Sequence, residues 1–120
     1  MKAKILIAED SAYMRTILKD VLLRNGYDVV GEAENGKEAV ALYGKLRPDI
    51  VTMDITMPEM DGIEALKAIK ETYPSARIVM VSAMGQQNLV IEAIRLGAAD
   101  FFIKPLQSER VVEALDRAMK

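Results

Sequence analysis

The sequence contains no cysteine and no histidine among its 120 residues. Without cysteine, neither a disulfide framework nor thiolate chemistry is available. Without histidine, the chain has no His-activated nucleophile and no His-ligated zinc site. Carboxylates, hydroxyls and lysines must therefore carry any chemistry that the protein performs.

The chain also lacks a strong excess of charge and a long apolar run. Its 16 basic and 18 acidic residues give a net charge of -2, and no basic cluster marks a surface for nucleic acid or an anionic membrane. No segment approaches the ~20 apolar residues of a membrane span, and the N-terminus lacks a signal-type apolar stretch. We therefore expect a cytoplasmic protein. With 51% hydrophobic residues, the chain matches one compact domain over residues 1–120.

Five short apolar runs, rich in β-branched or aromatic residues, predict strands. They cover residues 4–8, 29–30 with flanking Tyr27 and Ala33, 50–53, 78–81 and 101–103. Helical periodicity fills the intervals between them. The clearest helical stripe is spaced i, i+3, i+4, i+7 and i+8, ends before Gly26, and consists of Met14, Ile17, Leu18, Val21 and Leu22.

Further stripes predict helices over about 35–47, 61–73, 86–97 and 108–119, with Ser108 as the N-cap of the last one. Five strands that alternate strictly with five helices imply right-handed crossovers and a parallel sheet covered on both faces. The expected fold is therefore a doubly wound α/β sandwich of the flavodoxin-like type, with strand order 2-1-3-4-5.

Charged residues follow three of the predicted strands. Glu9 and Asp10 come after the first, Asp54 closes the third, and Lys104 comes after the last. Because the carboxyl ends of parallel strands meet at one edge of the sheet, we expect the three carboxylates to converge there. They would repel one another unless a cation compensates their charge, and an all-oxygen site suits Mg²⁺, with Mn²⁺ or Ca²⁺ as substitutes.

We expect Asp10 and Asp54 as direct metal ligands, the backbone carbonyl of Thr56 as a third, and Glu9 as a ligand through a bound water. Ser82, which ends the fourth predicted strand, and Lys104 would each bind an oxygen of a phosphoryl group. Since no cysteine or histidine is available, Asp54 is the candidate nucleophile, and its product would be an aspartyl phosphate.

Each of these motifs is weak alone, but their combination is specific. Glu9-Asp10, the segment 51–62, Ser82-Ala83 and Lys104-Pro105 together resemble a response-regulator receiver domain, and the resemblance covers the whole chain. It implies that Asp54 accepts a phosphoryl group from a histidine kinase with the help of Mg²⁺, that Ser82 is a switch hydroxyl, and that Lys104 is the family's lysine.

Segments 54–62 and 82–87 further resemble stand-alone chemotaxis regulators. That resemblance implies a monomer that is phosphorylated by a chemotaxis histidine kinase and then binds the flagellar motor switch protein, with a dedicated phosphatase as a further partner. The binding face would comprise the fourth helix, fifth strand and fifth helix, and we expect Gln86, Gln87 and Val90 on it. Phe101 falls at the switch aromatic, where many members have tyrosine, so its switching would be steric.

Two other classes fit the sequence less well. A phosphatase of the haloacid-dehalogenase type requires a second aspartate two residues after the nucleophile, where this chain has Thr56, and a flavodoxin requires a phosphate loop, where Glu9 and Asp10 would repel a phosphate. We therefore expect a phosphoacceptor switch with self-catalysed phosphotransfer and autodephosphorylation, not an enzyme. A receiver of another phosphorelay, or one detached from a larger regulator, remains an alternative.

Two carboxylates also have simpler interpretations. Asp10 could serve only as the N-cap of the first helix, and Asp61 could contribute only to a turn and a cap. Beside Asp54 we favour the metal for Asp10, whereas for Asp61 we favour the cap.

Overall fold

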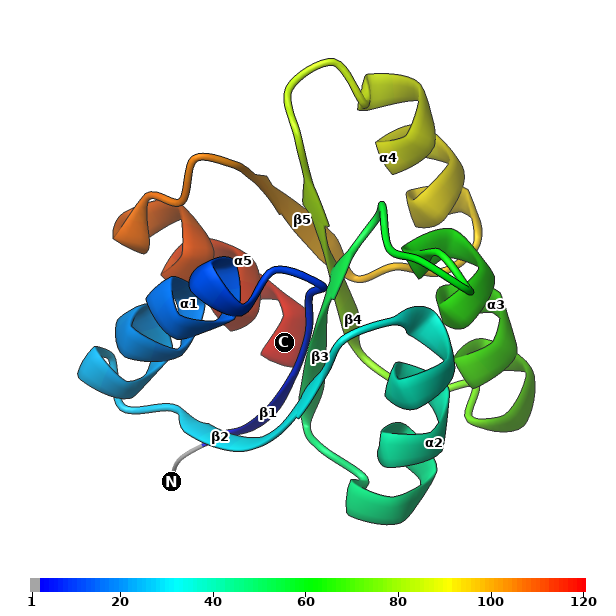
Figure 1. The fold of residues 1–120 in the computed structure, drawn as a ribbon, viewed down its shortest axis with the longest axis horizontal. Helices are drawn as coiled ribbons and strands as arrows, with labels where there is room; N and C mark the ends of the chain where they lie inside the picture. Colours follow the sequence, from blue (N-terminus) through cyan, green and yellow to red (C-terminus); the bar gives the residue numbers. More distant parts are fainter. Residues whose placement is uncertain (1–2) are drawn as a thin grey trace.

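Five strands alternate with five helices along residues 3–120, the part of the chain that the computed structural model describes (Figure 1). The elements are β1 (Lys4–Ala8), α1 (Ala12–Arg24), β2 (Asp28–Ala33), α2 (Gly36–Leu46), β3 (Ile50–Asp54), α3 (Gly62–Thr72), β4 (Ile78–Ser82), α4 (Gln87–Arg95), β5 (Asp100–Ile103) and α5 (Ser108–Met119). All strand pairs are parallel, in the order β2-β1-β3-β4-β5. The predicted fold class is thus confirmed.

The sheet separates two apolar cores. Helices α1 and α5 cover one face, and α2, α3 and α4 cover the other, as Figure 1 shows. Alternate residues of a strand point to opposite faces, so Leu6 packs beneath α2 and α3 while Ile5 and Ile7 pack beneath α1 and α5. Burial on both faces explains why β1, β3 and β4 are nearly continuous apolar runs.

The helix starts test three sequence-based interpretations. Ser11, not Asp10, is the N-cap of α1, because its side chain accepts a hydrogen bond from the Met14 backbone N–H at 3.2 Å. Asp61 forms a capping box with Glu64 at the start of α3, so its interpretation as a cap is confirmed.

The prediction for Ser108 is wrong by one residue. The chain is still extended at Gln107, with φ -116° and ψ 119°, and Gln107 therefore occupies the N-cap position. Ser108 is already helical, and its hydroxyl accepts a hydrogen bond from the Asn25 side chain at 3.3 Å.

The strand order reverses between β1 and β3, which lie side by side. After β1 the chain continues to β2 on one side of this pair, and after β3 it continues to β4 on the other side. In an open α/β sheet, the crevice at the carboxyl ends of such strands is the usual ligand site. Asp54 is the last residue of β3, and Glu9 and Asp10 directly follow β1. None of the helices within residues 3–120 combines the length and the apolar composition that crossing a membrane requires.

Candidate functional site

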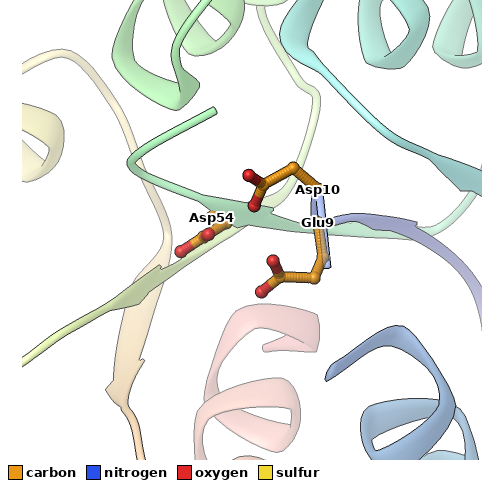
Figure 2. Close-up of side chains that lie close together, drawn as sticks. All are labelled: Glu9, Asp10 and Asp54. Carbon is orange, nitrogen blue, oxygen red and sulfur yellow. The ribbon is translucent and has the colours of Figure 1, made fainter. Parts of the chain in front are cut away.

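Three carboxylates meet at the carboxyl ends of β1 and β3. Carboxylate oxygens of Glu9, Asp10 and Asp54 all lie within 4.8 Å of one another, and Figure 2 shows the three side chains gathered at these strand ends. Glu9 and Asp54 are buried, whereas Asp10 is exposed. The topology therefore brings together the acidic residues that the sequence pattern selects.

Lys104 contacts two of these carboxylates from the end of β5. Its Nζ lies 2.7 Å from Glu9 Oε1 and 3.2 Å from Asp54 Oδ2, and its backbone N–H donates a hydrogen bond to the Ser82 carbonyl at 2.8 Å. Burial lowers the pKa of Lys104, but the hydrogen bond to Glu9 and the charges of Asp54 and Glu9 outweigh it and hold the pKa above its ordinary value. The ammonium therefore stays charged beside Asp54.

Asp54 carries an unfavourable charge in the absence of a metal. Burial, together with the negative charges of Glu9 and Asp10, raises the pKa of Asp54 from 3.8 to about 6, although Lys104 opposes the shift. A single ammonium thus does not fully compensate three neighbouring carboxylates. A hard divalent cation would complete the compensation, and the all-oxygen donor set fits such an ion. The acidic group could therefore hold a metal.

Thr56 and Ser82 border the acidic group. Ser82 is buried at the end of β4, where it pairs with Ile103, while Asp54 pairs with the preceding Val81. Thr56 lies in the loop after β3, and its hydroxyl accepts a hydrogen bond from Gln86 Nε2 at 2.9 Å. The loops after β3 and β4 are therefore linked directly across the rim of the site.

A groove of about 540 Å³ adjoins the site between α4 and β5. Its lining is mainly apolar and includes Met84, Val90, Ile91, Ile94, Phe101 and Ile103. Phe101 is 37% exposed, so its ring is partly free of the core. Ser82, at the end of β4, lines the groove, and Lys104 directly follows β5, so the open apolar surface reaches the edge of the acidic site.

The three residues expected on the partner face lie in different surroundings. Val90 is only 8% exposed and packs into the core beneath α4, so it contributes to the floor of the groove and not to an open face. The side-chain carbonyl of Gln86 accepts a hydrogen bond from the Ala83 backbone N–H at 2.7 Å, which turns Gln86 toward the loop after β4. Gln87 is exposed and lines the groove. The assignment of all three residues to a partner face stays a prediction.

Sequence reasoning missed the apolar residues that α4 leaves exposed. These are Leu89, Ile91 and Ile94: Leu89 and Ile94 flank the buried stripe formed by Ala93 and Val90, and Ile91 lies beyond it. The available signal was that the apolar residues of this helix cover a wider arc of its circumference than one core stripe requires.

The comparisons with known proteins agree with this geometry. Residues 5–116 match the response regulator receiver domain. The chain is 58% identical to the chemotaxis protein CheY of Thermotoga maritima over 100% of both chains. It is 57% identical to CheY of Bacillus subtilis over 99% of both chains.

Solved structures show the same similarity in three dimensions. The CheY chain of a CheX-CheY-BeF₃-Mg²⁺ complex from Borrelia burgdorferi superposes with a TM-score of 0.90 at 37% identity, over 94% of this chain and 86% of that one. The response regulator domain of Thermotoga maritima CheB gives a TM-score of 0.90 at 40% identity, over 99% and 97%. The family match, the full-length relatives and the acidic site at the sheet edge lead to one conclusion: the chain belongs to the response regulator receiver domain family.

Proposed function

We propose that Asp54 accepts a phosphoryl group from a chemotaxis histidine kinase, and that the phosphorylated protein binds the flagellar motor switch and so controls rotation. One observation carries the first part: the buried Asp54 carboxylate lies beside both an acidic pair and the Lys104 ammonium. The full-length identity to chemotaxis proteins supports the second part.

The proposed metal is Mg²⁺, which Mn²⁺ or Ca²⁺ could replace. Asp10, Asp54 and the Thr56 backbone carbonyl would hold it directly, and Glu9 through a water. When bound, the cation would offset the negative charge of the phosphoryl oxygens and the carboxylates. An Asp54 oxygen would attack the phosphorus of the kinase phosphohistidine. The P–O bond forms as the P–N bond breaks, and the electron pair of the broken bond leaves with the imidazole.

The remaining polar groups would bind the product. Lys104, already 3.2 Å from Asp54, would bind one phosphoryl oxygen, and the Ser82 hydroxyl would bind another. The same groups would assist hydrolysis of the aspartyl phosphate by water. The protein would thus phosphorylate and dephosphorylate only itself, as a phosphoacceptor switch and not as an enzyme with external substrates.

Movement of Ser82 toward the phosphoryl group would open space that the Phe101 ring can enter by steric rotation. Phe101 lines the groove between α4 and β5, so its rotation would reshape that surface. A change from 1:99 to 99:1 between two states requires about 5.5 kcal/mol of differential interaction. A few charge-assisted hydrogen bonds to a phosphoryl group supply energy of this order.

The proposal places the protein in the cytoplasm as a monomer, with the kinase and the motor switch as partners and no role for nucleic acid or membrane. A dedicated phosphatase is a further proposed partner, because a similar chain occurs in a complex of CheX with CheY. An alternative is a receiver of another phosphorelay or one detached from a larger regulator. Similar domains do occur in longer proteins, such as NtrX of Brucella abortus, of which this chain covers 27%.

Beryllofluoride, a phosphoryl analogue, tests the proposal as a whole. The protein would be titrated with a motor-switch peptide in the presence of Mg²⁺, with and without beryllofluoride, and Asp54→Asn would serve as the control. We expect beryllofluoride to tighten peptide binding in the wild-type protein only. Trapping without peptide binding would favour another relay, and the absence of any response to beryllofluoride would refute the switch.

A further inference from the structure

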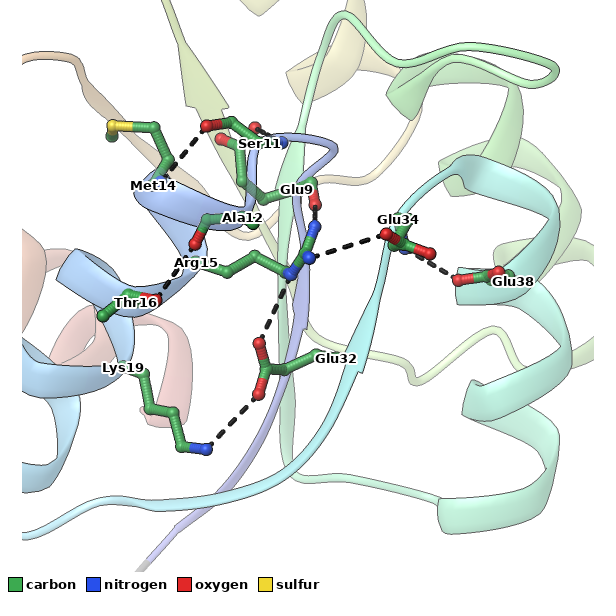
Figure 3. Close-up of polar contacts among 10 residues, drawn as sticks. All are labelled: Glu9, Ser11, Ala12, Met14, Arg15, Thr16, Lys19, Glu32, Glu34 and Glu38. Carbon is green, nitrogen blue, oxygen red and sulfur yellow. Dashed lines mark hydrogen bonds and ion pairs between the residues drawn. The ribbon is translucent and has the colours of Figure 1, made fainter.

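Arg15 connects three separate segments next to the acidic group. From α1, its Nη1 donates a 2.7 Å hydrogen bond to the backbone carbonyl of Glu9, its Nε lies 3.3 Å from Glu32 Oε1, and its Nη2 lies 3.6 Å from Glu34 Oε1 (Figure 3). The side chain is only 13% exposed. One guanidinium thus joins the turn after β1 to β2 and to the loop that follows β2.

The contact with Glu9 is made to its carbonyl and not to its carboxylate. The carboxylate of Glu9 is engaged elsewhere, because Oε1 binds Lys104 and Oε2 accepts a 3.0 Å hydrogen bond from the Ser11 backbone N–H. The charge of Arg15 is matched by Glu32 and Glu34. Arg15 is therefore placed to fix a peptide group, and neutralising the acidic group is the task of Lys104.

The peptide that Arg15 holds leads directly to Asp10. The backbone N–H of Glu9 donates a 2.9 Å hydrogen bond to Ala33, so β2 fixes one end of this residue and Arg15 the other. Asp10 itself is exposed. Its position relative to Asp54 consequently depends on the orientation of the Glu9–Asp10 peptide, since rotating that peptide would swing Asp10 away from β3.

We propose that Arg15 is a positioning residue for the metal site: by holding the Glu9 carbonyl, it keeps Asp10 where it can share a cation with Asp54. This inference rests on the proposed function, because it assumes that the acidic group binds Mg²⁺. Groups that orient metal ligands typically change metal affinity by 10 to 100-fold when they are removed.

Positioning and simple electrostatics predict opposite effects. Arg15 is a cation near a cation site, so removing its charge would strengthen Mg²⁺ binding if charge alone mattered. If Arg15 acts by holding the turn, its removal weakens binding in spite of the lost repulsion. Lys19 provides a matched control, because its Nζ also pairs with Glu32, at 3.3 Å from Oε2. Unlike Arg15, it does not bind the Glu9 carbonyl in this network.

The test is an Mg²⁺ titration by calorimetry, together with the Mg²⁺-dependent shift of the Asp10 amide resonance, at a temperature where circular dichroism shows each variant fully folded. For Arg15→Met we expect about 10-fold weaker Mg²⁺ binding, and for Lys19→Met, unchanged or slightly tighter binding. Arg15→Lys keeps the charge and can still donate one hydrogen bond, so it should recover part of the lost Mg²⁺ affinity. It serves in place of Arg15→Met if that variant does not fold.

Each outcome decides a different point. Mg²⁺ binding by Arg15→Met that is equal to or tighter than that of the wild-type protein would overturn the inference while leaving the metal site in place. Equal losses in Arg15→Met and Lys19→Met would also overturn it, because the Glu9 carbonyl would then not be the decisive contact. If the wild-type protein binds no Mg²⁺, the proposed function fails, and the inference falls with it.

Discussion

At the scale of single residues, Asp54 is held in a position that opposes its own ionisation. Its folded-state pKa of about 6 exceeds the ordinary value of 3.8 because burial and the charge of Glu9 outweigh the attraction of Lys104. A carboxyl with a raised pKa binds its proton more tightly in the folded state. Its stabilising contribution is therefore fully present below about pH 4 and is lost as the pH rises through about 6.

This linkage predicts that Asp54→Asn is more stable than the wild-type protein at pH 7 in the absence of metal. The expected difference is on the order of 3 kcal/mol, since the pKa rises from 3.8 to about 6 and one pKa unit corresponds to about 1.4 kcal/mol. Thermal unfolding in EDTA at pH 5 and pH 7 would measure it. The difference in stability between the variant and the wild-type protein should be smaller at pH 5, where Asp54 is partly protonated. It should also be smaller on adding Mg²⁺ at pH 7. An Asp54→Asn variant no more stable than the wild-type protein at pH 7 would contradict the unfavourable ionisation of Asp54.

At the scale of elements, the start of α3 is packed against the end of β3. The Gly62 N–H donates a 2.8 Å hydrogen bond to the Ile55 carbonyl, and a Cβ at Gly62 would collide with the backbone carbonyl of Asp54. Glycine is therefore required here by the close approach of two backbones. The packing also fixes the segment that carries the site's central carboxylate.

Gly62→Ala should accordingly lower the free energy of unfolding by about 1–3 kcal/mol, the usual cost of overpacking. It should also weaken Mg²⁺ binding, because relief of the collision displaces Asp54. Gly44→Ala in α2 is a matched control, since its nearest neighbour would be the Tyr73 hydroxyl at 3.3 Å; there alanine should be neutral or stabilising by up to ~1 kcal/mol. Urea unfolding compares the two, and similar effects would show that the contact at Gly62 is unimportant.

At the scale of the whole molecule, the acidic site and the apolar groove occupy neighbouring but distinct surfaces. The groove lies between α4 and β5, and Ile91 and Ile94 remain exposed along it. The two surfaces meet near Ser82 and Met84, which line the groove at the end of β4 and in the loop beyond it. The molecule can therefore separate phosphoryl chemistry from partner binding while keeping the two in contact.

This separation predicts that Ile94→Ser reduces binding of a motor-switch peptide by at least about 10-fold in the presence of Mg²⁺ and beryllofluoride, because exposed apolar anchors dominate interface energy. Mg²⁺ affinity should not change. Leu23→Ser on α1, at 52% exposure similar to the 44% of Ile94, is the control and should retain peptide binding. Fluorescence anisotropy of a labelled peptide would measure both, and unaltered binding by Ile94→Ser would exclude the groove.

The sequence was sufficient for the fold and for the convergence of Glu9, Asp10 and Asp54, because short apolar runs, helical stripes and the geometry of parallel strands are local patterns with few solutions. The Arg15 network was not predictable in this way. It depends on a register shift between β1 and β2 after Ile5, which places Glu32 opposite Ile7. Such irregularities leave no periodic trace in the sequence.

The surroundings of the residues expected on the partner face were unpredictable for a different reason. Val90 and Ile91 are adjacent apolar residues on α4, and only the rotation of the packed helix decides which one faces the core. The orientation of Gln86 was not predictable, because its hydrogen bonds with Ala83 and Thr56 join two loops that are far apart in the sequence. Helix rotation and side-chain contacts of this kind are set by tertiary packing, so they require the structure.

Intact-protein mass spectrometry after incubation with a small phosphodonor such as acetyl phosphate tests whether Asp54 is the phosphoacceptor. We expect one added phosphoryl group in the wild-type protein with Mg²⁺, none with EDTA, and none in a folded Asp54→Asn variant. Phosphoryl incorporation at another residue of that variant, or undiminished incorporation in EDTA, would contradict this assignment.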